Sequence, residues 1–153
     1  MTNNDTAQKA TRSKYTIPLQ IIDLEPDGFH PLLQVLIFGK SFLLVLDTGA
    51  SKTAFDKNLL LDADSDAILT ASDRLSTGVG SNSMESSTAT ITDLRIGRLK
   101  VAPFEAAVLD LSTINNAYSQ MGHPEVLGVL GGDILMKYEA VVDYGKAQLL
   151  LKK

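Results

Sequence analysis

Hydrophobic residues recur at every second position over much of the chain, a spacing that predicts β-strands with one buried face. The first two such segments contain, in order, Tyr15, Ile17, Leu19 and Ile21, and then Leu33, Val35 and Ile37. Residues 42–46, Phe-Leu-Leu-Val-Leu, are apolar on both faces and therefore predict an interior strand. Gly39 and Lys40 separate this strand from residues 32–38, which favours a tight hairpin.

The rest of the chain continues this pattern of short strands with few helices. The expected elements are, in order, a short helix or loop over 56–66, a hairpin of 74–80 and 86–96, a strand over 101–111, a helix over 112–121, a Gly-broken strand over 126–132, a helix over 133–138 and a closing hairpin over 141–151. Ser112 and Asp133 are the expected N-caps of the two later helices. Because no βαβ alternation is present, the sequence predicts an all-β fold.

Composition agrees with one folded domain over residues 14–153, preceded by a polar, aperiodic and flexible tail over 1–13. Hydrophobic residues make up 44% of the 153 residues and charged residues 21%, values typical of a folded protein. The absence of cysteine excludes thiol catalysis and disulfides. A net charge of −4 without a basic cluster argues against nucleic acid as a partner. No signal peptide or membrane span is seen, so we expect a cytoplasmic location and no membrane partner.

Asp47 is the strongest candidate for chemistry, because it follows the predicted interior strand directly. A carboxylate held at the end of a buried strand is suited to proton transfer, since desolvation perturbs its proton affinity. Thr48 supplies a hydroxyl, Gly49 allows close backbone approach and Ala50 leaves room beside the carboxyl. The competing interpretation is an aspartate that merely caps a turn.

Three segments together resemble an aspartic protease. Leu46-Asp47-Thr48-Gly49-Ala50-Ser51 resembles the active-site loop of that family, the Gly-rich centre at 78–83 resembles its flap, and residues 129–135, Val-Leu-Gly-Gly-Asp-Ile-Leu, resemble its second signature. The order and spacing match from Tyr15 to Leu151, nearly the whole chain.

The resemblance implies the retropepsin type, because the chain holds a single D-T-G where pepsin-like chains hold two such loops. It implies a closed β-barrel-type acid protease fold with one or two short helices. It also implies a homodimer in which the two Asp47 carboxyls share a proton, one activating a water that attacks the peptide carbonyl. No metal or cofactor is required, and the substrate is a peptide or protein.

Supporting roles also follow from the resemblance. Asp47 is the catalytic residue, and the loop that supports it consists of Thr48, Gly49, Ala50 and Ser51, with each Thr48 hydroxyl reaching the partner loop. The expected flap residues that bind the substrate are Gly78, Val79, Gly80 and Ser81. Gly131 is expected to pack beside the active loop rather than to touch substrate.

Two departures from the family pattern matter. Ala50 stands where pepsin-like loops often carry a hydroxyl, as in retroviral enzymes, and predicts a mildly acidic to neutral pH optimum. Ser51 stands where retroviral enzymes commonly have an aspartate that serves the dimer region.

Other polar residues have simpler interpretations. Asp133 is expected to be a cap or a partner of a backbone amide, and Asp143 a turn residue. His30 and His123 each precede a proline and lack ligand spacing, so we expect surface positions and no metal site. The glycines at 128–132 lack the Lys-Ser or Lys-Thr of a phosphate loop.

Two alternatives to a dimeric peptidase stay open. One is a catalytically idle protease-like fold that serves as a peptide-binding or dimerisation module. The other is a monomer without a competent site. The apolar chain end at 148–153 fits pairing across a dimer interface or within one subunit.

Overall fold

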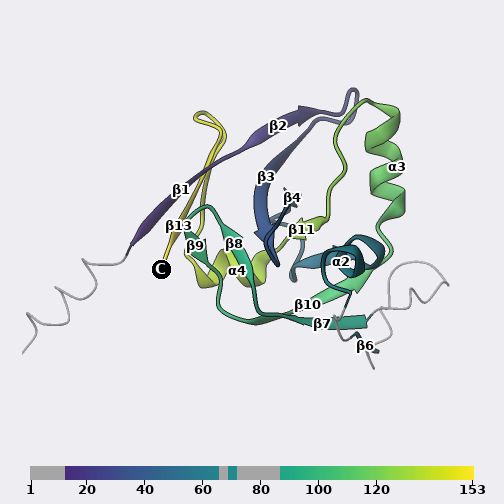
Figure 1. Cartoon of the computed structure of the whole chain (residues 1–153). Coiled ribbons are helices and arrows are strands. Elements are labelled where there is room, and N and C mark those ends of the chain that lie inside the picture. The colour runs from purple at the N-terminus through teal and green to yellow at the C-terminus, as the bar shows by residue number, and fades with distance from the viewer. Residues whose placement is uncertain (1–12, 66–68, 72–86) are drawn as a thin grey trace, which may run out of the picture.

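The computed structural model describes residues 13–65, 69–71 and 87–153 (Figure 1). The expected tail lies almost wholly outside these residues, as does the centre of the 74–96 hairpin. The described strands are β1 (Lys14–Pro18), β2 (Gln20–Asp23), β3 (Phe29–Ile37), β4 (Lys40–Leu46), β5 (Ala54–Asp56), β6 (Thr70–Ala71), β7 (Ser87–Ile91), β8 (Leu94–Ile96), β9 (Leu99–Lys100), β10 (Phe104–Leu109), β11 (Gly128–Leu130), β12 (Val141–Asp143) and β13 (Gln148–Lys152). The described helices are α2 (Lys57–Ala63), α3 (Ser112–Gln120) and α4 (Gly132–Lys137).

Most strands belong to one large curved sheet with the order β6-β7-β10-β5-β11-β4-β3-β8-β9, and β2 adds to β3. The structure therefore confirms the prediction of a mostly β fold. It contains three short helices in its described part, where one or two were expected. None of the described helices is long and apolar enough to span a bilayer.

Strand β4 is an interior strand, as its apolar sequence predicts. It pairs antiparallel with β3 on one side and parallel with β11 on the other. The turn of the β3–β4 hairpin lies one residue earlier than expected, at Phe38 and Gly39, whose φ values are +49° and +77°. Two consecutive positive φ angles suit a tight hairpin, but Phe38 is not a residue type that signals such a turn.

A second sheet is formed by the two ends of the described chain. Strand β13 lies between β1 and β12, and Lys14 pairs with Lys152 at one end of the β1–β13 register. Figure 1 shows β1 running beside the closing hairpin of β12 and β13, whose ribbon is yellow. The C-terminal strand therefore pairs within one subunit, with a neighbour on each side.

The core follows from the alternation along β3. Leu33, Val35 and Ile37 are buried in the main hydrophobic cluster, whereas Gln34 and Leu36 between them are exposed. A smaller cluster lies where α3 covers the sheet and consists of Ile22, Leu24, Leu32, Val45, Tyr118 and Val126. The main chain of β4 thus separates two packed regions, with Leu44 and Leu46 in the main cluster and Val45 in the smaller one.

Helix starts differ from the expected caps. Leu111, not Ser112, is the N-cap of α3, and Asp110 instead accepts a hydrogen bond from the Ser112 amide at 3.0 Å. Gly131, not Asp133, is the N-cap of α4. Asp56 caps α2 by accepting from the Leu59 amide at 3.1 Å.

Asp56 also joins this helix start to the chain before α3. Its other carboxylate oxygen accepts from the Leu111 amide at 2.9 Å, and the side chain is only 5% exposed. A buried carboxylate with two backbone donors fixes both segments at once.

Candidate active site

Asp47 begins a tight turn at the end of β4. Its amide donates to the Leu130 carbonyl at 3.0 Å, which continues the parallel pairing of β4 with β11 by one residue. Its carboxylate accepts from the Gly49 amide at 3.0 Å, and the Ala50 amide donates to its carbonyl at 3.2 Å. The carboxyl is half-buried while Thr48 and Gly49 are exposed, so the turn holds Asp47 at the edge of solvent.

A second loop, which follows β11, is bonded to the Asp47 loop. The Gly132 amide donates to the Ala50 carbonyl at 2.7 Å, and the Asp133 amide donates to the Ser51 carbonyl at 3.1 Å. A methyl group at Gly131 would lie 2.6 Å from the backbone carbon of Lys52, so the loops approach too closely for a side chain there. Gly131 lies beside the Asp47 loop, the position that the sequence leads us to expect.

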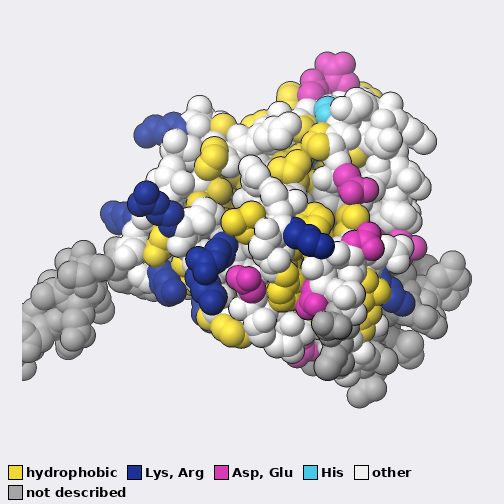
Figure 2. All heavy atoms as spheres, in the orientation of Figure 1, with side chains coloured by type: hydrophobic (Ala, Val, Ile, Leu, Met, Phe, Trp, Pro, Cys, Tyr) yellow, Lys and Arg dark blue, Asp and Glu magenta, His cyan; other side chains and the backbone are white. Residues whose placement is uncertain are grey.

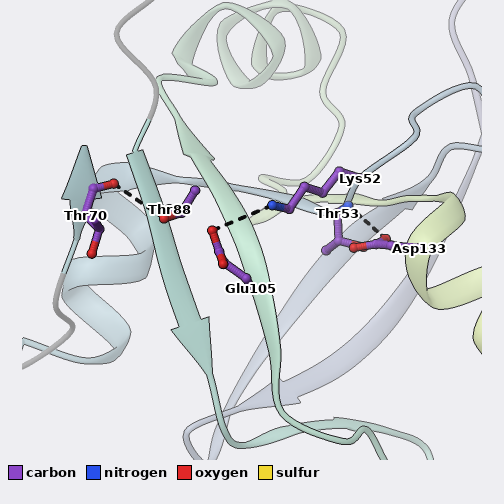
Figure 3. A network of polar contacts seen from close by, with 6 residues as sticks. All are labelled: Lys52, Thr53, Thr70, Thr88, Glu105 and Asp133. Atoms are coloured by element: carbon purple, nitrogen blue, oxygen red, sulfur yellow. Dashed lines mark hydrogen bonds and ion pairs between the residues drawn. The ribbon is translucent and has the colours of Figure 1, made fainter. Parts of the chain in front are cut away.

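Thr53 and Asp133 connect the same two loops through side chains (Figure 3). The carboxylate of Asp133 accepts from the Thr53 amide at 2.9 Å and from the Thr53 hydroxyl at 2.7 Å. That hydroxyl also accepts from the Gly131 amide at 3.0 Å. Thr53 is fully buried, and the sequence analysis did not identify it.

Asp133 thus has the second of its two expected roles. It is the partner of a backbone amide rather than the cap of α4. The only signal available in the sequence was its place in the second signature, because Thr53 lies 80 residues away.

A solvent-exposed ion pair lies just beyond this network. Lys52 Nζ lies 3.9 Å from a carboxylate oxygen of Glu105 on β10, with both side chains about half exposed (Figure 3). Pairs of this kind contribute little to stability. The pair places one positive and one negative side chain next to each other at the surface, directly after the Asp47 loop.

Tyr118 is a further polar group near Asp47 that sequence reasoning missed. Its hydroxyl lies 2.6 Å from His30 Nδ1, although its side chain is only 4% exposed. Burial raises the pKa of Tyr118, and the negative charge of Asp47 raises it further. His30 lies near the start of β3 and is exposed, which confirms the surface position expected for it.

The remaining expected residues divide into two groups. The flap residues Gly78, Val79, Gly80 and Ser81 lie outside the described residues. Asp143 lies at the end of β12 and accepts from the Lys146 amide at 2.9 Å, the turn role that we expected. Within the described residues, no cluster of three or more His, Asp or Glu side chains is arranged to hold a metal ion.

Comparison with known proteins places the geometry in context. A family model described as aspartyl protease matches residues 33–134, which include both loops. Among solved structures, the fold is similar to a retropepsin-like aspartic protease from Rickettsia conorii, with a TM-score of 0.54 and 17% sequence identity over 93% of this chain and 94% of that one. A search of curated proteins found no significant match.

Proposed function

We propose that this chain, which belongs to the aspartyl protease family, is an aspartic endopeptidase of the retropepsin type that acts as a homodimer. The observation that carries the proposal is the position of Asp47, half-buried at the end of an interior strand and fixed by the Leu130 carbonyl. The chain has a single D-T-G loop, so a second subunit would supply the other carboxyl. The substrate is a peptide or protein, and a cytoplasmic location is part of the same proposal.

The chemistry follows from two carboxyls at close quarters. Like charges that meet across a two-fold axis cannot both ionise, so the Asp47 pair shares one proton and titrates as a unit. The ionised member accepts a proton from a water that attacks the peptide carbonyl, and the protonated member donates to the developing oxyanion.

The protein's own contribution is rigidity. Asp47 can serve in a pair only if its loop is held in one position relative to the subunit. Two hydrogen bonds from the second loop, to the carbonyls of Ala50 and Ser51, and the contact of the buried Thr53 with Asp133 supply that support.

The chain ends constrain how the dimer forms. Because β13 already pairs with β1 and β12, its hydrogen-bonding groups are used within the subunit. A partner subunit can therefore add to this sheet only at β1 or at β12, the two strands at its edges.

The first experiment compares the wild-type protein with Asp47→Asn on a diverse peptide library, with cleavage products identified by mass spectrometry. Wild-type protein should cleave, and Asp47→Asn should lose activity by at least about a hundredfold while its melting temperature is unchanged. Asp143→Asn is the matched control and should retain activity, since Asp143 lies in a surface turn. Absence of cleavage by any version would leave the idle binding or dimerisation module as the better account.

The second experiment tests the shared site by mixing subunits. In an equal mixture that exchanges freely, about one quarter of the dimers contain two wild-type chains. At a fixed concentration of wild-type chain, adding the Asp47→Asn chain should therefore depress activity well below that of wild-type protein alone. Adding the Asp143→Asn chain to the same amount of wild-type chain should not depress activity. Activity that stays proportional to the amount of wild-type chain would contradict a shared dyad.

A further inference from the structure

Basic side chains from distant parts of the sequence gather at one end of the molecule. Figure 2 shows Lys and Arg side chains on the side of β1, β13, β8 and β9, whereas Asp and Glu side chains lie mostly toward the β2–β3 turn and α3. We call the first group the basic end, and it consists of Lys14, Arg95, Arg98, Lys100, Lys152 and Lys153. In a chain with a net charge of −4, this segregation creates a local positive field.

Strand register brings like charges face to face within the basic end. Lys14 is paired with Lys152 across β1 and β13, and Arg95 is paired with Lys100 across β8 and β9. Like charges directly opposite each other on neighbouring strands are destabilising. Arg95 also lies 3.8 Å from Asp93, but both side chains are about half exposed, so this ion pair is weak. An anion bound here would therefore relieve a repulsion that the isolated chain retains.

The two like-charged pairs belong to one continuous surface. The Lys153 amide donates to the Ser13 carbonyl at 3.0 Å, which extends the pairing of β1 with β13 by one residue. The Nζ atom of Lys153 donates to the Lys100 carbonyl at 3.4 Å. The end of the three-stranded sheet therefore lies against β9, an edge strand of the large sheet.

An apolar hollow borders the basic end between β1, β3 and β8. Its volume is about 320 Å³. Its lining includes Pro18, Gln34, Leu36, Arg95 and Gly97. Leu36 is 41% exposed and lies opposite Arg95 in the β3–β8 register, so an apolar and a cationic side chain stand next to each other at the rim.

We propose that the basic end and this hollow form a docking surface for an acidic, partly apolar segment of another protein. Carboxylates of the segment would lie against the basic end, and one of its apolar side chains would enter the hollow beside Leu36. Charge complementarity is the observation that selects an acidic occupant. None of the residues named for this surface belongs to the Asp47 loop, so the inference goes beyond the proposed protease function and does not rest on it.

The size of the hollow and the charge around it favour a protein segment over other anions. The volume is at the lower end of the range for small-ligand sites, about 300–1,000 Å³, so it takes a side chain but not a nucleic acid duplex or a bilayer. A duplex carries one negative charge about every 1.7 Å along its axis, so it would also meet the acidic part of the molecule. A second copy that docked by its acidic part would make a head-to-tail contact, which leads to rings or open filaments rather than a two-fold dimer.

Lysines on edge strands have another role, which is to keep the sheets of different molecules from pairing. Lys14 lies on β1 and Lys100 on β9, and both strands are at sheet edges. That role alone predicts aggregation when the lysines are removed, but it predicts no binding of an acidic peptide. A binding measurement therefore separates the two roles.

Binding is measured by fluorescence anisotropy with a fluorescein-labelled peptide of about ten residues in which glutamate and leucine alternate. All proteins carry Asp47→Asn, so that the result is independent of any peptide cleavage, and this parent chain should bind the peptide. The dissociation constant should rise at least about tenfold between about 50 and 250 mM NaCl, because salt screens the charge pairs. Arg95→Gln/Lys100→Gln should weaken binding at least about tenfold. The matched control is Lys40→Gln/Lys57→Gln, which removes two exposed cations outside the basic end and should bind like the parent chain.

The apolar part of the surface and the other occupants are tested in the same assay. Leu36→Ser should weaken binding of the glutamate–leucine peptide about threefold, because an apolar contact is lost. A peptide of alternating serine and leucine should bind at least about tenfold more weakly than the glutamate–leucine peptide. Binding of the glutamate–leucine peptide that Arg95→Gln/Lys100→Gln leaves unchanged would refute the proposal. Tighter binding of a short DNA duplex or of phosphatidylserine vesicles would overturn it in favour of that anion.

Two further measurements use the protein alone. Sedimentation at low salt should show no filaments, and filaments that Arg95→Gln/Lys100→Gln disperses would assign the surface to a second copy and overturn the proposal. Lys14→Gln should raise the melting temperature by about 1–3 °C at low salt, because it removes one of two opposed like charges. The difference should vanish near about 1 M NaCl, where charges are screened over about 3 Å. A lower melting temperature for Lys14→Gln at low salt would remove the repulsion on which the proposal rests.

Discussion

Replacing Thr53 with valine removes a hydroxyl but keeps the shape of the side chain, and so tests the link between the two loops of the site. The hydroxyl donates to Asp133 at 2.7 Å and accepts from the Gly131 amide at 3.0 Å, and the side chain is 0% exposed. A hydrogen bond to a charged group contributes about 1.5–3 kcal/mol, and a buried amide left without an acceptor costs about 1–3 kcal/mol. We therefore expect Thr53→Val to lower the free energy of unfolding by about 3 kcal/mol.

In a chain of this length, such a loss corresponds to a fall in melting temperature of about 6–12 °C. Urea unfolding followed by circular dichroism gives the free energy directly. Thr53→Ser keeps the hydroxyl and should lose only about 1 kcal/mol, the contribution of one buried methyl group. Thr90→Val makes the same chemical change at an exposed position of β7 and should have little effect.

A double-mutant cycle separates the contact from general damage. Asp133→Asn keeps one acceptor but removes the charge, so its effect and that of Thr53→Val should be non-additive by about 1–2 kcal/mol. The reasoning would be refuted if Thr53→Val were within about 0.5 kcal/mol of the wild type, the range of ordinary surface substitutions.

Three other predictions concern stability. Gly128→Ala would place a methyl group 2.0 Å from the Ala54 carbonyl oxygen, so it should lower the free energy of unfolding by at least about 3 kcal/mol, as measured in urea. Gly132→Ala is the control and should be nearly neutral, because the nearest backbone oxygen there would be 3.4 Å from the methyl group. Asp56→Ala leaves two backbone amides without their acceptor and should lower the unfolding free energy by about 2–4 kcal/mol; a loss below about 1 kcal/mol would contradict its bridging role. The hydrogen bond from the Ser112 amide at the start of α3 lowers the pKa of Asp110 from 3.8. The stability that ionised Asp110 contributes is therefore present above that value and is lost as the pH falls through the lowered folded-state pKa. Asp110→Asn should consequently be slightly destabilising at pH 7 and neutral near about pH 2, as measured by melting temperature.

The parts of the fold that the sequence predicted are those in which the signal is local. Alternation along β3 and the doubly apolar β4 follow from the two-residue period of strand side chains, which does not depend on distant partners. The closing hairpin of β12 and β13 could be predicted for the same reason. The exact turn of the β3–β4 hairpin was missed by one residue, because Phe38 takes a positive φ that its residue type disfavours.

The predicted N-caps of α3 and α4 were wrong for a different reason. Ser112 and Asp133 are residue types that favour N-caps, but a cap is defined by backbone geometry as well as by composition. At α4 the backbone places Gly131 at the N-cap position, and the carboxylate of Asp133, already inside the helix, accepts from the amide of Ile134 and from Thr53, 80 residues earlier.

The same distinction explains the site. The Asp47 turn is closed by two local hydrogen bonds, from the Gly49 amide to the Asp47 carboxylate and from the Ala50 amide to the Asp47 carbonyl, so a short motif sufficed to find it. Its surroundings are assembled by contacts between segments far apart in the sequence: Thr53 meets Gly131 across 78 positions, and His30 meets Tyr118 across 88. Threonine and tyrosine at those positions carry no local pattern that distinguishes a buried support from an ordinary core residue. A sequence motif therefore identifies Asp47, the residue that we propose as catalytic, whereas the residues that hold its loop become visible only when β4, β5 and β11 are placed side by side.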